Sequence, residues 1–116
     1  HCTASGKTFL ASLPMAKLKS FLATLHLQAM TQNTHVSTAT LLTEIAQVRK
    51  NGYALDQEEF MDDMVAIAVP VTDPKNRYIA ALAFHGPTQR VTISDAIKSK
   101  ELLQSAARRI SESLFD

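Results

Sequence analysis

Acidic side chains are concentrated in one short stretch of the chain. Five of the eleven acidic residues fall within eight positions: Asp56, Glu58, Glu59, Asp62 and Asp63. Such a run is usually a solvated loop, and we expect that for most of the five. Asp56 differs because it follows a short strand candidate, Tyr53–Leu55, beside an alanine-rich hairpin. Its carboxylate could accept hydrogen bonds from a ligand hydroxyl or from a backbone turn.

The first eight residues partly match the phosphate-binding pattern G-x-x-x-x-G-K-[ST]. The pattern needs glycine where this chain has His1, since a missing side chain lets backbone amides surround a phosphate. No strand is visible before the segment, so we do not expect nucleotide hydrolysis. A polar turn entering a helix still leaves amides unpaired at the positive end of the helix, where a carboxylate can bind. Ordinary capping by Thr3 or Ser5 explains the same residues equally well.

The histidines and the single cysteine do not form a pattern typical of a reactive centre. No i, i+4 or paired spacing relates the four histidines, which are His1, His26, His35 and His85. Cys2 lacks the His-Asp pattern of an activated nucleophile. His85 closes the second strand of the expected hairpin, where a histidine is more often a surface or capping group. We therefore expect no metal, no cofactor and no catalytic residue.

Four helices are expected to position these side chains. Apolar spacing, polar entry residues and the Asn51-Gly52 stop predict helices around Gly6–Leu13, Leu18–Leu25, Ser37–Asn51 and Leu103–Leu114. Pro14 ends the first helix or opens the second.

Between the third and fourth helices the pattern changes to that of strands. Val65–Val71 is β-branched at every second residue with alanines between, so large and small side chains face opposite sides. With a turn at Asp73–Asn76 and a second strand at Tyr78–Phe84, it predicts an antiparallel hairpin. A row of alanines leaves room for a packed helix, the commoner case, or for a ligand. The expected class is α+β, with helices against an antiparallel sheet.

Length, charge and cysteine content exclude several classes of protein. A chain of 116 residues suits one domain, and a net charge of +1 argues against a strong nucleic-acid surface. One cysteine favours a reducing compartment, so we expect a cytoplasmic protein. No apolar run is long enough to span a membrane, and no signal peptide is visible. Because the first residue is not Met, we interpret the chain as a fragment of a longer protein.

Several sequence blocks occur in a fixed order, and together they indicate a protein family more specifically than any single block does. They are His1-x-Thr3-Ala4-Ser5-Gly6-Lys7, Asn51-Gly52-Tyr53-Ala54-Leu55-Asp56-x-Glu58-Glu59, Ile67-Ala68-x-Pro70-Val71-x-Asp73, Ala80-Ala81-Leu82-x-x-x-Gly86-Pro87 and Ala106-Ala107-x-x-Ile110-Ser111. The series resembles the effector-binding domain of IclR-type bacterial transcriptional regulators. That resemblance implies a GAF-like antiparallel sheet with helices on its faces. Residues 1–116 would be the C-terminal part of that single domain, without its first strands or the winged helix-turn-helix.

The resemblance also implies a pocket for a small organic acid. In such domains the carboxylate of the acid meets amides at the start of the helix, here Thr3, Ala4 and Ser5. The aspartate of the G-Y-A-x-D block, Asp56, belongs to the same pocket.

At three further pocket positions the chain departs from the family pattern. A cysteine and two serines of the pattern fall at Ala66, Ala83 and His85. A buried polar ligand group facing two alanines would lose about 1–3 kcal/mol. We therefore expect an acid larger than glyoxylate or pyruvate, with an apolar or aromatic portion. His85 lies on the same strand face as Ala83 and could hydrogen-bond that ligand or offer it a positive charge.

These inferences predict a sensing and self-association domain of a transcriptional regulator, not an enzyme. The acid would shift the arrangement of a homodimer or homotetramer, and DNA would be bound only by a separate N-terminal domain. One alternative is an oligomerisation-only module with an occluded cavity. The other is a small enzyme that uses Asp56 or His85 as a general base on a bound acid.

Overall fold

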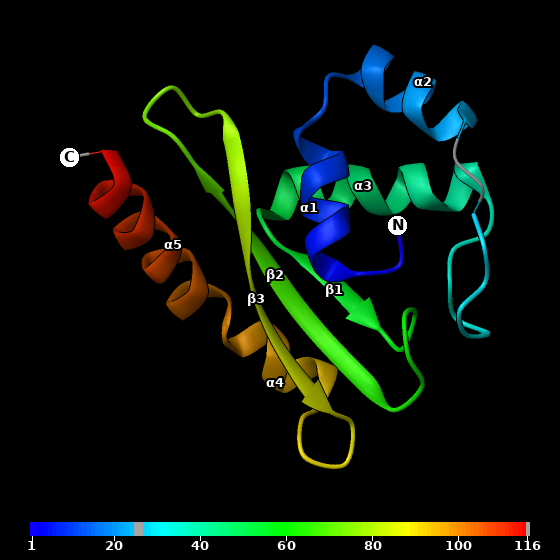
Figure 1. The fold of residues 1–116 in the computed structure, drawn as a ribbon. Helices are drawn as coiled ribbons and strands as arrows, with labels where there is room; N and C mark the ends of the chain where they lie inside the picture. Colours follow the sequence, from blue (N-terminus) through cyan, green and yellow to red (C-terminus); the bar gives the residue numbers. More distant parts are fainter. Residues whose placement is uncertain (25–26, 116) are drawn as a thin grey trace.

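The computed structural model describes residues 1–24 and 27–115. Leu25 and His26, considered above for the second helix and for metal binding, lie outside the described residues. The elements run in the order α1 (Ala4–Ser12), α2 (Met15–Thr24), α3 (Thr38–Asn51), β1 (Ala54–Gln57), β2 (Met64–Thr72), β3 (Tyr78–Pro87), α4 (Ile93–Lys98) and α5 (Lys100–Phe115) (Figure 1). The strands form one antiparallel sheet in the order β1-β2-β3, which confirms the α+β class.

The hairpin β2–β3 confirms the alternation of large and small residues. Ala66 and Ala68 face α1, whereas Val69 and Val71 pack with Ala107 of α5 on the opposite face. Helices therefore cover both sides of the sheet, with α1 on one face and α4 and α5 on the other (Figure 1). The sheet positions α1 through its small side chains and α5 through its branched ones.

The turn between β2 and β3 is held by one carboxylate. Asp73 Oδ1 accepts hydrogen bonds from the amides of Lys75 (3.0 Å) and Arg77 (2.8 Å). Its Oδ2 accepts from the Arg77 guanidinium at 2.7 Å. The Arg77 amide and the other donors lower the pKa of Asp73. This arrangement closes the turn between the two strands that carry Ala66, Ala83 and His85.

The four expected helices are confirmed, and two expectations about the chain after β2 are corrected. Gly52 ends α3 in the left-handed region at φ 76°, as the Asn-Gly stop predicts. β3 continues to Pro87, so His85 lies within the strand and not at its end. The short helix α4 was not among the expected elements, although Thr92 and Asp95 form a complete capping box at its start.

Within residues 1–24 and 27–115, no helix combines the length and the apolar character that a membrane crossing requires.

Candidate functional site

Three of the predicted site residues lie side by side across the sheet. Asp56 of β1 pairs with Ala66 of β2, and Ala66 pairs with His85 of β3. Residues directly opposite one another in antiparallel strands project from the same face. The next row on that face contains Ala54, Ala68 and Ala83, in the same strand order. The sheet therefore places a carboxylate and an imidazole at the two ends of a row with a small residue between them.

The start of α1 lies over this face. Ala4 is fully buried and packs with Ala66, Ala68 and Ala83. For these alanines the structure shows helix packing, one of the two alternatives that the sequence left open. His85 is exposed, so the row opens to solvent at the β3 edge.

Capping satisfies some of the amides at the positive end of α1. Thr3 Oγ1 accepts from the Gly6 amide at 2.9 Å, and the Thr3 carbonyl accepts from the Lys7 amide at 3.1 Å. The amides of Ala4 and Ser5 have no acceptor within the helix. A Cβ on Gly6 would lie 2.9 Å from Thr3 Oγ1, so this glycine serves the cap.

Asp56 is buried and is held by the turn that follows it. Its Oδ1 accepts from the amides of Glu59 (2.8 Å) and Phe60 (3.3 Å). Burial, reinforced by the neighbouring Glu59 carboxylate, raises the pKa of Asp56 despite these amides and the charge of Lys7. Burial therefore disfavours the charged form of this carboxyl relative to a solvated aspartate.

We expect Asp56→Asn to remove a pH dependence of stability. A raised carboxyl pKa stabilises the fold fully below the unfolded-state pKa, and that contribution is lost as pH rises through the folded-state pKa. Asn keeps an acceptor oxygen for both amides but does not ionise. The free energy of unfolding of the variant, minus that of the wild type, should therefore increase as the pH rises above 3.8, the ordinary pKa of aspartate. Urea denaturation at a series of pH values measures this difference, and a pH-independent difference would contradict the assignment.

Next to Asp56 lies a buried ionic cluster that the sequence did not predict. The Lys7 side chain is fully buried, and its Nζ lies 2.7 Å and 2.8 Å from the two carboxylate oxygens of Glu59. The same Nζ donates to the Leu55 carbonyl at 2.6 Å and to Glu44 Oε1 at 3.1 Å. His35 Nε2 lies 3.3 Å from Glu59 Oε1.

The cluster bears on two of the motifs considered in the sequence. Glu59 is buried at 4% exposure and is not part of a solvated loop, whereas Asp62 and Asp63 are exposed. The lysine of the imperfect phosphate motif, Lys7, uses its ammonium inside the fold to bind protein acceptors. The available signal was the helical period, which places Lys7 on the same stripe of α1 as Ala4, Thr8 and Ala11.

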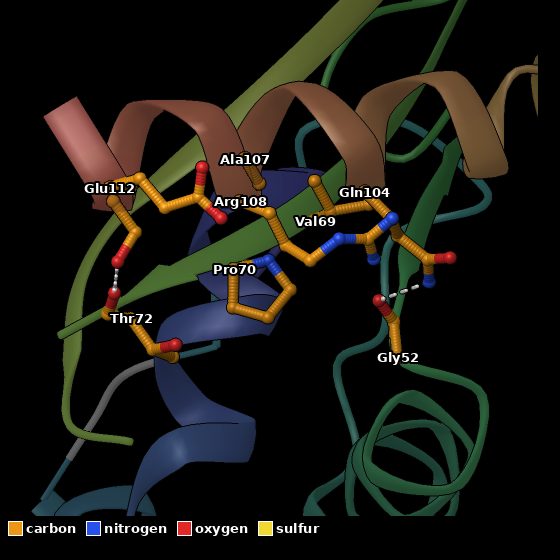
Figure 2. Close-up of a pocket in the computed structure, with 9 residues that line it drawn as sticks. Gly52, Val69, Pro70, Thr72, Gln104, Ala107, Arg108 and Glu112 are labelled. Carbon is orange, nitrogen blue, oxygen red and sulfur yellow. Dashed lines mark hydrogen bonds between the residues drawn. The ribbon is translucent and has the colours of Figure 1, made fainter. Parts of the chain in front are cut away.

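In the part of the chain that the structure describes, three surface hollows are lined by none of the predicted site residues. One, of about 350 Å³, lies between α5 and the end of β2, where Gln104 donates to the Gly52 carbonyl at 3.3 Å (Figure 2). A second, of about 670 Å³, lies at the C-terminal end of α1 beside Arg49 and Tyr78. The third, of about 390 Å³, borders the ionic cluster at His35 and Glu44. In the described part of the chain, no group of three His, Cys, Asp or Glu side chains is arranged to hold a metal.

The fold is that of the effector-binding domains of bacterial transcriptional regulators. Residues 1–112 match the family model described as bacterial transcriptional regulator IclR C-terminal. The chain therefore belongs to this family, and the resemblance inferred from the ordered blocks is confirmed.

Relatives and solved structures agree with this membership. XynR of Escherichia coli K12 is 37% identical over 98% of this chain and 45% of its own length. AllR of the same strain is 33% identical over 98% of this chain and 42% of its own length, so the chain spans less than half of either regulator.

Two solved structures share the fold. One is a double mutant of the PobR inducer-binding domain from Acinetobacter, complexed with 3-hydroxybenzoic acid; it has a TM-score of 0.91 and 30% identity, covering 96% of this chain and 64% of that one. The other is the C-terminal domain of Escherichia coli KdgR, with a TM-score of 0.87 and 36% identity, covering 96% and 68% respectively.

Proposed function

We propose that this chain is the small-molecule sensing part of an IclR-type regulator. It binds an organic acid between the start of α1 and the row of Asp56, Ala66 and His85. Binding shifts the arrangement of a homodimer or homotetramer and thereby controls DNA binding by a separate winged helix-turn-helix domain. Residues 1–116 form the C-terminal part of the effector-binding domain.

One observation supports this proposal most directly. The helix start that leaves the amides of Ala4 and Ser5 without helical acceptors lies on the same sheet face as Asp56 and His85. The helix dipole favours an anion at this end, and the Asp56 carboxyl can accept a hydrogen bond from a ligand hydroxyl. His85 at the open edge adds a donor or, when protonated, a positive charge.

The walls favour an acid with an apolar or aromatic portion. Ala66 and Ala83 offer no hydrogen bond to a ligand hydroxyl or keto group, and such a group would be left unpaired. The PobR domain, complexed with 3-hydroxybenzoic acid, is a structural relative with an aromatic acid. Ala4 already packs on these alanines, so the acid enters from the exposed His85 side.

Thermal unfolding with glyoxylate, pyruvate and 3-hydroxybenzoate tests the proposal. A ligand that binds only the folded state adds RT ln(1 + [L]/Kd) to the free energy of unfolding, and so raises the unfolding temperature as its concentration increases. We expect 3-hydroxybenzoate to stabilise the protein more than the two small acids. Stabilisation by none of a wider panel of carboxylic acids would favour the oligomerisation-only module, which the packing of Ala4 on the alanines also allows. Chemical turnover of a stabilising acid would favour the enzyme.

We expect His85→Ala to weaken binding of the stabilising acid at least tenfold, about 1.4 kcal/mol. The variant removes the donor at the open end of the row. Because His85 is exposed, its loss should leave folding stability nearly unchanged. Isothermal titration calorimetry measures the change, with Gln89→Ala in the exposed turn beyond β3 as the matched control. An unchanged titration curve would remove His85 from the site.

A further inference from the structure

Lys7 connects two parts of the proposed site. One is the start of α1, and the other is the turn that holds Asp56. Lys7 lies one turn of α1 beyond Thr3 and Ala4, on the helix face towards the sheet. Its Nζ contacts the Leu55 carbonyl of β1 at 2.6 Å and both carboxylate oxygens of Glu59. The three N–H donors of this fully buried ammonium are thus surrounded by protein acceptors from two other segments.

Glu59 connects Lys7 to Asp56. The Glu59 amide donates to Asp56 Oδ1 at 2.8 Å, and Glu59 Oε2 accepts from the Gln57 amide at 3.0 Å. Thr34 Oγ1 donates to the Glu59 carbonyl, which fixes the turn from its other side. The Asp56 carboxyl is thus oriented by a turn whose own side chain is bound to Lys7.

We infer that Lys7, through Glu59, is a positioning residue that sets Asp56 relative to the amides at the start of α1. The inference rests on the proposed function for its role in acid binding. Lys7 itself does not touch the ligand, because its side chain is fully buried and its ammonium is surrounded by protein acceptors. Lys7 is thus a polar link between the helix start and the Asp56 turn, in addition to the packing of small side chains.

A double variant, Lys7→Met with Glu59→Gln, tests the inference without leaving a buried charge unpaired. Removing both partners of a buried pair is often nearly neutral for stability. Two-dimensional ¹H–¹⁵N NMR over a pH titration needs no ligand. In the wild type, the Phe60 amide shift should follow the ionisation of Asp56, because the Phe60 amide donates to Asp56 Oδ1 at 3.3 Å. In the folded double variant we expect that dependence to fall by more than half.

The second arm measures binding of 3-hydroxybenzoate by calorimetry. We expect at least tenfold weaker binding by the double variant, and unchanged binding by Leu18→Met, a mild change in the core between α1, α2 and α3. A double variant that keeps both the pH dependence of the Phe60 amide shift and the affinity overturns the inference. If 3-hydroxybenzoate does not bind the wild type, the proposed site loses its probe, and the NMR result alone decides whether Lys7 positions Asp56.

Discussion

Replacing Lys7 with Met alone is expected to lower the free energy of unfolding by about 3–5 kcal/mol. The variant leaves the Glu59 carboxylate, only 4% exposed, without the ammonium that lies 2.7 Å away. It also removes the donor to the Leu55 carbonyl. Domains of this size are stable by only about 5–15 kcal/mol, so the loss is a large fraction of the total.

Urea denaturation followed by circular dichroism measures this loss. Lys17→Met is the matched control, because Lys17 is exposed on α2 and should change stability by no more than about 0.5 kcal/mol. The double variant with Glu59→Gln should recover most of the stability that Lys7→Met loses. Equal stability of Lys7→Met and wild type would mean that the Lys7–Glu59 pair is not buried in solution.

The second large effect is expected from Ala4→Leu. Ala4 is fully buried against Ala66 and Ala68, which are at most 1% exposed, so the added atoms have no free space. Overpacking of this kind costs about 1–3 kcal/mol, and it must move the start of α1 away from the sheet. We therefore expect loss of acid binding together with the loss of stability.

Denaturation and calorimetry on Ala4→Leu separate the two effects. Ala16→Leu, at an exposed position of α2, is the control for adding the same side chain without a packed neighbour. If Ala4→Leu were as stable as the wild type, α1 could move away from the alanines of the sheet with little loss of free energy. Retained affinity in a destabilised variant would place the acid away from the helix start.

Local patterns in the sequence predicted most of the elements and the family. The β-branched alternation in Val65–Val71 and the Asn-Gly stop at Gly52 each depend on a few neighbouring residues, and both are confirmed. The ordered blocks identified the IclR family for the same reason, since their order and spacing are properties of the linear chain. The short helix α4 was not predicted, because a six-residue helix is too short to show a clear apolar period in the sequence.

Tertiary structure alone decided which charged groups are inside. Lys7 and Glu59 are 52 residues apart, and Thr34 reaches Glu59 from a third segment, so no local pattern brings them together. In sequence, Glu59 belongs to an acidic run like any solvated loop, and Lys7 belongs to an imperfect phosphate motif. Burial depends on which distant segments fold over a residue. The order of residues therefore predicted the strands and helices, whereas the tertiary packing decided that Lys7, Asp56 and Glu59 are buried near the alanines between α1 and the sheet.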